Sequence, residues 1–283
     1  MRTSRATPAG YPPGHFYSPV PDFEEVRRRA PALFDRSRRT VEGIDLREDA
    51  QLALVPELVA CLRDQPFTDQ PEGGRRYGFR NEAFCAVDAL TLHCFLRRHR
   101  PRRVVEVGSG HSSAMMLDTD ELFLGRATSL TFVEPFPDVL RAVVRPGDLE
   151  RATLLQQPVQ DVPLAPFQAL EAGDVLFIDS SHVSKIGSDV NHLFFRVLPA
   201  LAPGVLVHVH DIFFPFEYPE QWVLSGGCAW NEAYLLRAFL QFNPAFEVLF
   251  WGHFLWTFHA ERLSAELPRF ADNPGASLWL RRR

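Results

Sequence analysis

The sequence predicts an α/β protein: a doubly wound, seven-stranded sheet with a helical extension before it and an antiparallel hairpin at its C-terminal end. Three observations predict this fold. From residue 101 onwards, short apolar runs alternate with helix-like segments, which is typical of parallel strands joined by crossover helices. Glycines follow the first apolar run, as they do where a strand turns into a ligand-binding helix. After residue 231 the alternation breaks down.

The first 98 residues are predicted to form an arm, helices and a lid. Residues 1–22 are rich in proline, glycine and tyrosine and predict an irregular arm. Apolar residues at helical spacing predict helices in the stretches FEEVRRRAPALF, REDAQLALVPELVACLRDQ and AVDALTLHCFLRRHR. The arm segment HFYSPVPD is expected to lie over the bound ligand. The loop RYGFRNEAF (Arg76 to Phe84) is a second candidate for a cover over the site, because Asn81 and Glu82 are polar groups in an aromatic segment.

Residues 99–283 are predicted to form the ligand-binding domain. Its five strands are expected in RRVVEVG, SLTFVEP, ATLLQQPV, DVLFIDSS and GVLVHVHDI, with helices from Ser112, from Pro137, in FQALEAG and at about 187–201. A helix in NEAYLLRAFLQF then precedes FEVLFWGHFLWTFH, which has the pattern of strand, turn and strand, and ASLWLRRR closes the chain.

Composition excludes several classes of protein. The chain has 283 residues, a net charge of −5 and no CxxC pair among its four cysteines, so we expect reduced thiols and a cytoplasmic protein. No apolar run is long enough for a membrane span, and the N-terminus lacks the apolar core of a secretory signal. Arginine runs are short and local, so no nucleic-acid partner is indicated. The sequence is compatible with a homodimer.

The stretch VVEVGSGHSS (residues 104–113) predicts the ligand. Glycines after a strand let the backbone approach a ligand closely, and the next helix offers free N–H groups. A dinucleotide fold favours a third glycine where this chain has Ser113. Glu106, two residues before Gly108, is unfavourable beside a pyrophosphate. It suits a cationic ligand such as the amino group and sulfonium of S-adenosylmethionine.

Two further acidic residues follow the second and third predicted strands. Glu134, after the second predicted strand, is placed to accept both ribose hydroxyls of a nucleotide. Asp161, after the third, is either an acceptor for an adenine amino group or a helix cap. Because ligands lie at the carboxyl ends of strands in such sheets, the clusters FIDSSH and VHVHD are expected to face the same cleft.

These motifs resemble those of the class I S-adenosylmethionine-dependent methyltransferases, which have a Rossmann-like sheet ending in an antiparallel hairpin. The matching stretches are VVEVGSGHSS, FVEP, DVLFIDSSHVSK, LAPGVLVHVHDIFFPFEYP and WNEAYLLRAFLQFNPAFEV, and the likeness is strongest to a small bacterial methyltransferase-domain branch of secondary metabolism. The resemblance implies that the methionine end of the cofactor is lined by Glu106, Gly108, Ser109, Gly110 and Ser112, with Asp179 beside it. It also implies that Glu134 holds the ribose and Asp161 the adenine.

Transfer of a methyl group to a hydroxyl requires alignment of the partners and removal of a proton. Asp179, His182, His208, His210 and Asp211 follow or lie in the fourth and fifth predicted strands. In one mechanism His182 or His210 is the general base, with Asp179 nearby. His208, inside its strand, reads as a core or supporting group.

In the other mechanism a divalent metal, held by Asp179, His182, His210 and Asp211, lowers the pKa of the acceptor hydroxyl. Related metal-dependent methyltransferases have an acidic pair after the fifth strand, whereas this chain has His210-Asp211. A site rich in imidazole favours a transition metal over magnesium. Iron-based redox chemistry is a further alternative.

The segment DIFFPFEYPEQW is expected to supply a wall for an apolar or aromatic acceptor, either a small molecule or a peptide-borne group. Phe213, Phe214 and Tyr218 are the candidates, with Tyr17 of the arm opposite. The alternative is simple burial of these rings against the N-terminal helices.

The leading hypothesis is therefore an S-adenosylmethionine-dependent methyltransferase that acts on oxygen. The alternatives are a nicotinamide-dependent oxidoreductase on a Rossmann-like sheet, which a parallel last strand would favour, and a metal-binding relative that does not methylate.

Overall fold

A computed structural model of the chain describes residues 10–271 and 273–283. It contains one seven-stranded sheet with the strand order β3-β2-β1-β4-β5-β7-β6. The strands are β1 (Arg103–Val107), β2 (Ser129–Val133), β3 (Thr153–Leu155), β4 (Val175–Ile178), β5 (Leu206–Val209), β6 (Phe246–Trp251) and β7 (Leu278–Arg282).

The doubly wound α/β fold is confirmed. Strands β1 to β5 are parallel, and all five were expected from the sequence. The chain first builds outward from β1 to β3 and then returns to add β4 on the other side of β1. The point between β1 and β4 is therefore the topological switch point, where loops on the two sides diverge and leave room for a ligand.

The antiparallel end of the sheet is also confirmed, but its connection differs from the prediction. β7 pairs antiparallel with both β5 and β6. The segment expected to return as a strand instead forms helix α11 (Gly252–Glu266), and the chain's last apolar run becomes β7. Short apolar runs fit either a buried helix or a strand, and here packing against helix α2 (Glu48–Cys61) decides for a helix.

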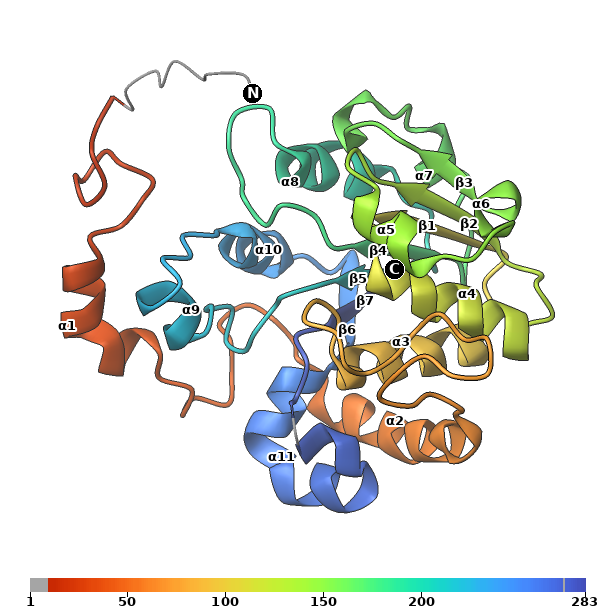
Figure 1. Cartoon of the computed structure of the whole chain (residues 1–283). Helices are drawn as coiled ribbons and strands as arrows, with labels where there is room; N and C mark the ends of the chain where they lie inside the picture. Colours follow the sequence, from red (N-terminus) through yellow and green to blue (C-terminus); the bar gives the residue numbers. More distant parts are fainter. Residues whose placement is uncertain (1–9, 272) are drawn as a thin grey trace.

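Helices cover both faces of the sheet (Figure 1). Helices α3 and α4 pack together on one face, and α8 and α10 lie on the other. The helices of the α/β region are α3 (Ala86–His99), α4 (His111–Phe123), α5 (Asp138–Val143), α6 (Asp148–Arg151), α7 (Ala165–Gln168), α8 (Asp189–His192), α9 (Glu220–Leu224) and α10 (Glu232–Leu240). After α8 the chain continues helically to residue 200.

The N-terminal extension is attached in two places. Helix α1 (Phe23–Leu33) is capped by Asp22, whose carboxylate accepts hydrogen bonds from the N–H groups of Glu24 and Glu25, and it packs against α9. Helix α2 packs against α3 and α11. The boundary at residue 98 stays a prediction, although α3 is buried along most of its length. In the part of the chain that the structure describes, no helix is both long enough and apolar enough to cross a bilayer.

Candidate active site

The candidate active site lies at the switch point, where the turn after β1 meets the end of β4. Gly108 has a positive φ of 83°, and a Cβ added there would lie 1.7 Å from the carbonyl oxygen of Asp179. The Gly108 N–H donates to the carbonyl of Val133 at 3.0 Å, and the Asp179 N–H donates to Val107 at 2.9 Å. Only glycine permits this close approach, which brings the predicted cofactor turn and Asp179 to one edge of the sheet.

Glu106 is fully buried beneath this turn. The hydroxyl of Ser112 donates to one carboxylate oxygen at 2.6 Å, and the hydroxyl of Ser113 donates to the other. Ser113 in turn accepts a hydrogen bond from the Gly110 N–H at 3.0 Å. Burial raises the pKa of Glu106 to about 7, although the hydrogen bonds from these two hydroxyls act in the opposite direction and lower the pKa. Ser113, which stands where a dinucleotide fold favours glycine, therefore helps to hold the acid in place.

The acids after β2 and β3 lie on the same side of the sheet but differ in their surroundings. Glu134 accepts hydrogen bonds from the N–H groups of Ser109 at 3.1 Å and Phe136 at 2.7 Å, so it ties the β1 turn to the β2 turn. A carboxylate has about four acceptor positions, so Glu134 retains capacity for ribose hydroxyls. The exposed Asp161 ends a short 3-10 turn and caps no helix, since the residue at the N-terminus of α7 is Leu164.

The polar residues after β4 and β5 form a compact cluster around His182. Its Nδ1 lies 2.8 Å from a carboxylate oxygen of Glu232, at the start of α10. Its Nε2 lies 3.4 Å from Asp179 and 3.5 Å from Asp211. Three elements that are distant in sequence thus place three carboxylates around one imidazole.

This arrangement does not fit the prediction of His182 as a general base. Burial opposes its protonation, but the hydrogen bonds and charges of Asp179 and Glu232 outweigh burial and raise the pKa of His182 to about 11. The ring is therefore an imidazolium at neutral pH and has no free lone pair with which to accept a proton.

His210 is also enclosed. Its side chain is buried, its Nδ1 has no partner among the described residues, and its ring packs 5.4 Å from the ring of Phe84. Burial lowers the pKa of His210, but the charges of Asp179 and Asp211 outweigh burial and raise it. His208 is fully buried and stacks on Phe177 at 3.8 Å. Burial keeps the pKa of His208 well below its usual range, in agreement with its reading as a core residue.

The two aspartates are the accessible members of the cluster. The side chain of Asp179 is 27% exposed and that of Asp211 is 15% exposed, against 7% for His182. Burial raises the pKa of Asp211 despite the nearby histidines, whereas His210 and His182 outweigh burial and lower the pKa of Asp179. Asp211 and His182 both have positive φ values, 56° and 58°. Strained backbone of this kind in non-glycine residues is typical of functional sites.

The predicted metal ligands lie close together, and the bound metal itself stays a prediction. Asp179 and Asp211 both face the ring of His182, whose Nε2 lies 3.4 Å from one carboxylate and 3.5 Å from the other. Within residues 10–271 and 273–283, no set of three or more His, Cys, Asp or Glu side chains is arranged to hold an ion.

The predicted aromatic wall lies largely in the core. Phe214 is fully buried against Trp251, and Tyr218 is 1% exposed with its hydroxyl accepting from the Ala233 N–H. Phe213 is half-buried. For Phe214 and Tyr218 simple burial therefore fits better than a wall for the acceptor. Phe214 packs against Trp251 at the end of β6, whereas the prediction named the N-terminal helices as the packing partner. Tyr17 is 64% exposed, and its ring contacts the ring of its neighbour Phe16 in a tilted arrangement.

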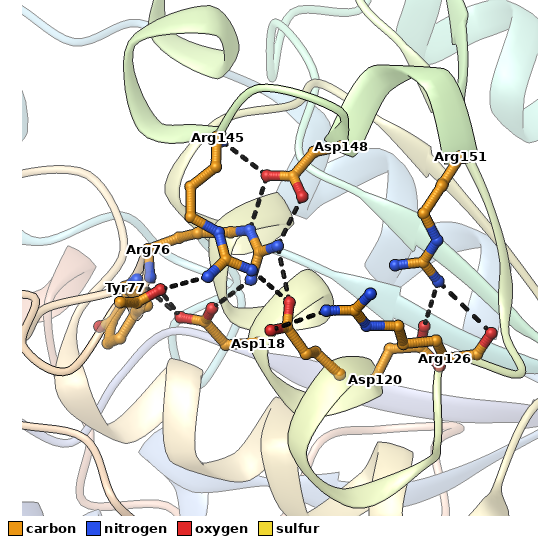
Figure 2. A network of polar contacts seen from close by, with 10 residues as sticks. Arg76, Tyr77, Asp118, Asp120, Arg126, Arg145, Asp148 and Arg151 are labelled. Carbon is orange, nitrogen blue, oxygen red and sulfur yellow. Dashed lines mark hydrogen bonds and ion pairs between the residues drawn. The ribbon is translucent and has the colours of Figure 1, made fainter.

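The loop from Arg76 to Phe84 is anchored rather than hinged. Arg76 is buried and forms ion pairs with Asp118 at 2.7 Å, Asp148 at 2.5 Å and Glu121 at 2.9 Å. Figure 2 shows the contacts of Arg76 with Asp118 and Asp148, together with the N–H groups of Arg76 and Tyr77 that converge on Asp118. The loop therefore forms a fixed wall against the cluster, which it reaches through the Phe84 ring.

Sequence reasoning assigned no role to Glu232 or Trp230. Glu232 is fully buried and holds His182, and the Trp230 ring packs 4.7 Å from the His182 ring. The available signal was the acid in WNEAYLL, at the first turn of an otherwise apolar helix. Only the tertiary structure brings that turn to the end of β4.

Comparisons with known proteins show what this chain resembles. Residues 105–212 match the family described as a methyltransferase domain. An uncharacterised protein of Archaeoglobus fulgidus is 38% identical over 165 residues, which cover 57% of this chain and 74% of that protein. Among solved structures, the SAH-bound methyltransferase PaMTH1 of Podospora anserina is 16% identical with a TM-score of 0.46, covering 93% of this chain and 98% of that one. TomG of Streptomyces achromogenes, an O-methyltransferase in complex with SAM, is 16% identical with a TM-score of 0.39, covering 79% and 87%.

Proposed function

The chain belongs to the class I S-adenosylmethionine-dependent methyltransferase family, and from this premise we propose that it methylates a hydroxyl oxygen of a small natural-product or peptide-borne acceptor. One observation carries the proposal. The turn that bears Gly108 packs directly on the backbone of Asp179, so the cofactor turn and the carboxylate cluster share one edge of the sheet. The antiparallel β7 argues against the nicotinamide-dependent alternative, which would favour a final parallel strand.

The residues at this edge of the sheet are the candidates for binding the cofactor. The N–H groups at the start of α4 and the turn Gly108–Gly110 would receive the methionine part, with the buried Glu106 beneath it, held by the Ser112 hydroxyl. Glu134 would accept the ribose hydroxyls, and the exposed Asp161 would accept from the adenine amino group. When bound, S-adenosylmethionine supplies an activated methyl group on a cationic sulfur.

Asp211 is the side chain best placed to take the acceptor's proton. It is partly exposed, and burial raises its pKa towards the range useful to a general base. As the acceptor oxygen bonds to the methyl carbon and the carbon–sulfur bond breaks, the hydroxyl proton would pass to the Asp211 carboxylate. The sulfur keeps the electron pair and loses its charge, so atoms and charge balance.

His182 and Glu232 act on this base indirectly. Glu232 fixes the His182 ring through Nδ1, and the Nε2 side of the ring faces Asp179 and Asp211. The positive ring holds two carboxylates near each other that would otherwise repel. In this arrangement the histidine serves as an internal cation, and no step of the mechanism passes through a metal.

Calorimetric titration with S-adenosylhomocysteine tests the proposal. We expect saturable binding to the natural protein and to Asp211→Asn, since Asp211 does not hold the cofactor. Release of S-adenosylhomocysteine in the presence of an accepted hydroxyl compound should fall by about 10²–10⁴-fold in Asp211→Asn. Asp49→Asn, on the exposed face of α2, is the matched control and should behave like the natural protein. Absence of binding to the natural protein would contradict the proposal.

A further inference from the structure

A cavity of about 340 Å³ lies between the N-terminal arm and the segment that follows β5. Pro19, Pro21 and Val26 line one side, and Trp230 and Tyr234 line the other. We call it the arm cavity. Its volume is within the range of about 300–1,000 Å³ that is usual for small-molecule sites.

The walls of the arm cavity favour an apolar ring. Leu33, Phe34, Val223 and Ala229 also line it, and most of the lining residues are hydrophobic. Trp230 is itself held edge-on by Trp222 and Tyr218, whose ring centroids both lie 5.8 Å away. A flat, rigid face of this kind gives a ring a large contact area, and few side-chain rotations are lost on binding.

One wall of the cavity carries a hydrogen-bond acceptor, the carboxylate of Glu217. Glu217 lines it, and its Oε1 accepts from the Tyr234 hydroxyl at 2.5 Å and from the Tyr218 N–H at 3.0 Å. In the described part of the chain, its Oε2 accepts no hydrogen bond from any side chain or backbone group. This oxygen is not among the buried polar atoms that lack a partner, so it is open to solvent and free to accept a hydrogen bond from a hydroxyl or N–H group of a ligand.

The inner end of the arm cavity adjoins the carboxylate cluster. Trp230 lines the cavity and also contacts the His182 ring at 4.7 Å. Asn231 lines it as well, and its N–H donates to the carbonyl of His182 while its side chain accepts from the Ser184 N–H at 2.6 Å. A molecule that fills the cavity is therefore separated from His182 by a single side chain.

We propose that the arm cavity binds the non-reacting part of the methyl acceptor, an aromatic or alicyclic ring whose hydroxyl or amine group donates to Glu217. The inference rests on the proposed function only in calling this ligand the acceptor. The preference for a ring with a donor follows from the cavity itself. The arm, which the sequence placed over the cofactor, thus contributes to ligand binding through its prolines rather than through Tyr17.

Two probes that differ in one donor test the inference: 4-propylphenol and its methyl ether, 4-propylanisole. Calorimetry without cofactor should show the phenol binding about tenfold more tightly than the ether, because only the phenol donates to Glu217. In Glu217→Ala the two probes should bind equally. Ala229→Phe fills the cavity and should weaken phenol binding by tenfold or more, whereas Ala169→Phe, on an exposed position after α7, should not change it.

Equal affinities of phenol and ether in the natural protein, or unchanged phenol binding in Ala229→Phe, would overturn the inference. The same preparations are titrated with S-adenosylhomocysteine. If the natural protein binds S-adenosylhomocysteine but does not distinguish the phenol from the ether, only the inference about the arm cavity is refuted. If the natural protein does not bind S-adenosylhomocysteine, the proposed function is refuted. Retained cofactor binding by Ala229→Phe also shows that this variant is folded.

Discussion

Substitution of Gly108 by alanine is expected to destabilise the protein by about 4 kcal/mol and to abolish binding of S-adenosylhomocysteine. The φ of 83° alone costs an L-residue about 1–2 kcal/mol. The new Cβ would also lie 1.7 Å from the Asp179 carbonyl oxygen. The β1 turn and β4 must then separate, which disrupts the backbone hydrogen bonds from Gly108 to Val133 and from Asp179 to Val107, each worth about 1 kcal/mol.

Gly125→Ala is the matched control. Gly125 also has a positive φ, 70°, but a Cβ there meets no atom within 4 Å. It therefore carries the backbone strain without the collision, and we expect a loss of about 1–2 kcal/mol with normal cofactor binding. Urea unfolding measures the stability of both variants, and calorimetry measures their binding. The reasoning is refuted if Gly108→Ala is no less stable than Gly125→Ala, or if it binds S-adenosylhomocysteine normally.

Three further outcomes are expected. Arg76→Ala leaves buried carboxylates without their cation and should lower the free energy of unfolding in urea by about 3–5 kcal/mol. Arg38→Ala removes one partner of an exposed ion pair and should lower it by less than about 1 kcal/mol. Equal losses in the two variants would contradict this account of the Arg76 loop. Because the folded pKa of Glu106 is about 7, above its ordinary 4.5, the folded state holds the extra proton and stability should fall as pH rises from about 4.5 to 7. Glu106→Gln should flatten that fall by up to about 3 kcal/mol, and an unchanged pH profile would argue against burial of the acid. Chelator treatment should leave methyl transfer unchanged, and restoration of lost activity by an added divalent ion would overturn the role given to His182 as internal cation.

The alternating part of the fold could be predicted from the sequence because its signals are local. Apolar runs such as VVEV and DVLFI are short, buried on both faces and bounded by turns, and few other structures accommodate that pattern. The end of the chain was harder. The run FLWTFH suits a strand or a buried helix equally, and only its packing against α2 made it part of α11.

At the site, local patterns were enough to predict which residue types follow each strand. Glu106 and Gly108 had to meet Asp179, because parallel strands present their carboxyl ends at one edge. How those groups act depends on contacts that form only in the folded protein. The approach of Glu232 from α10 makes His182 an imidazolium, and burial in the core removes Phe214 from the acceptor's path. Both outcomes depend on charges and contacts between residues far apart in sequence, and local patterns do not encode those.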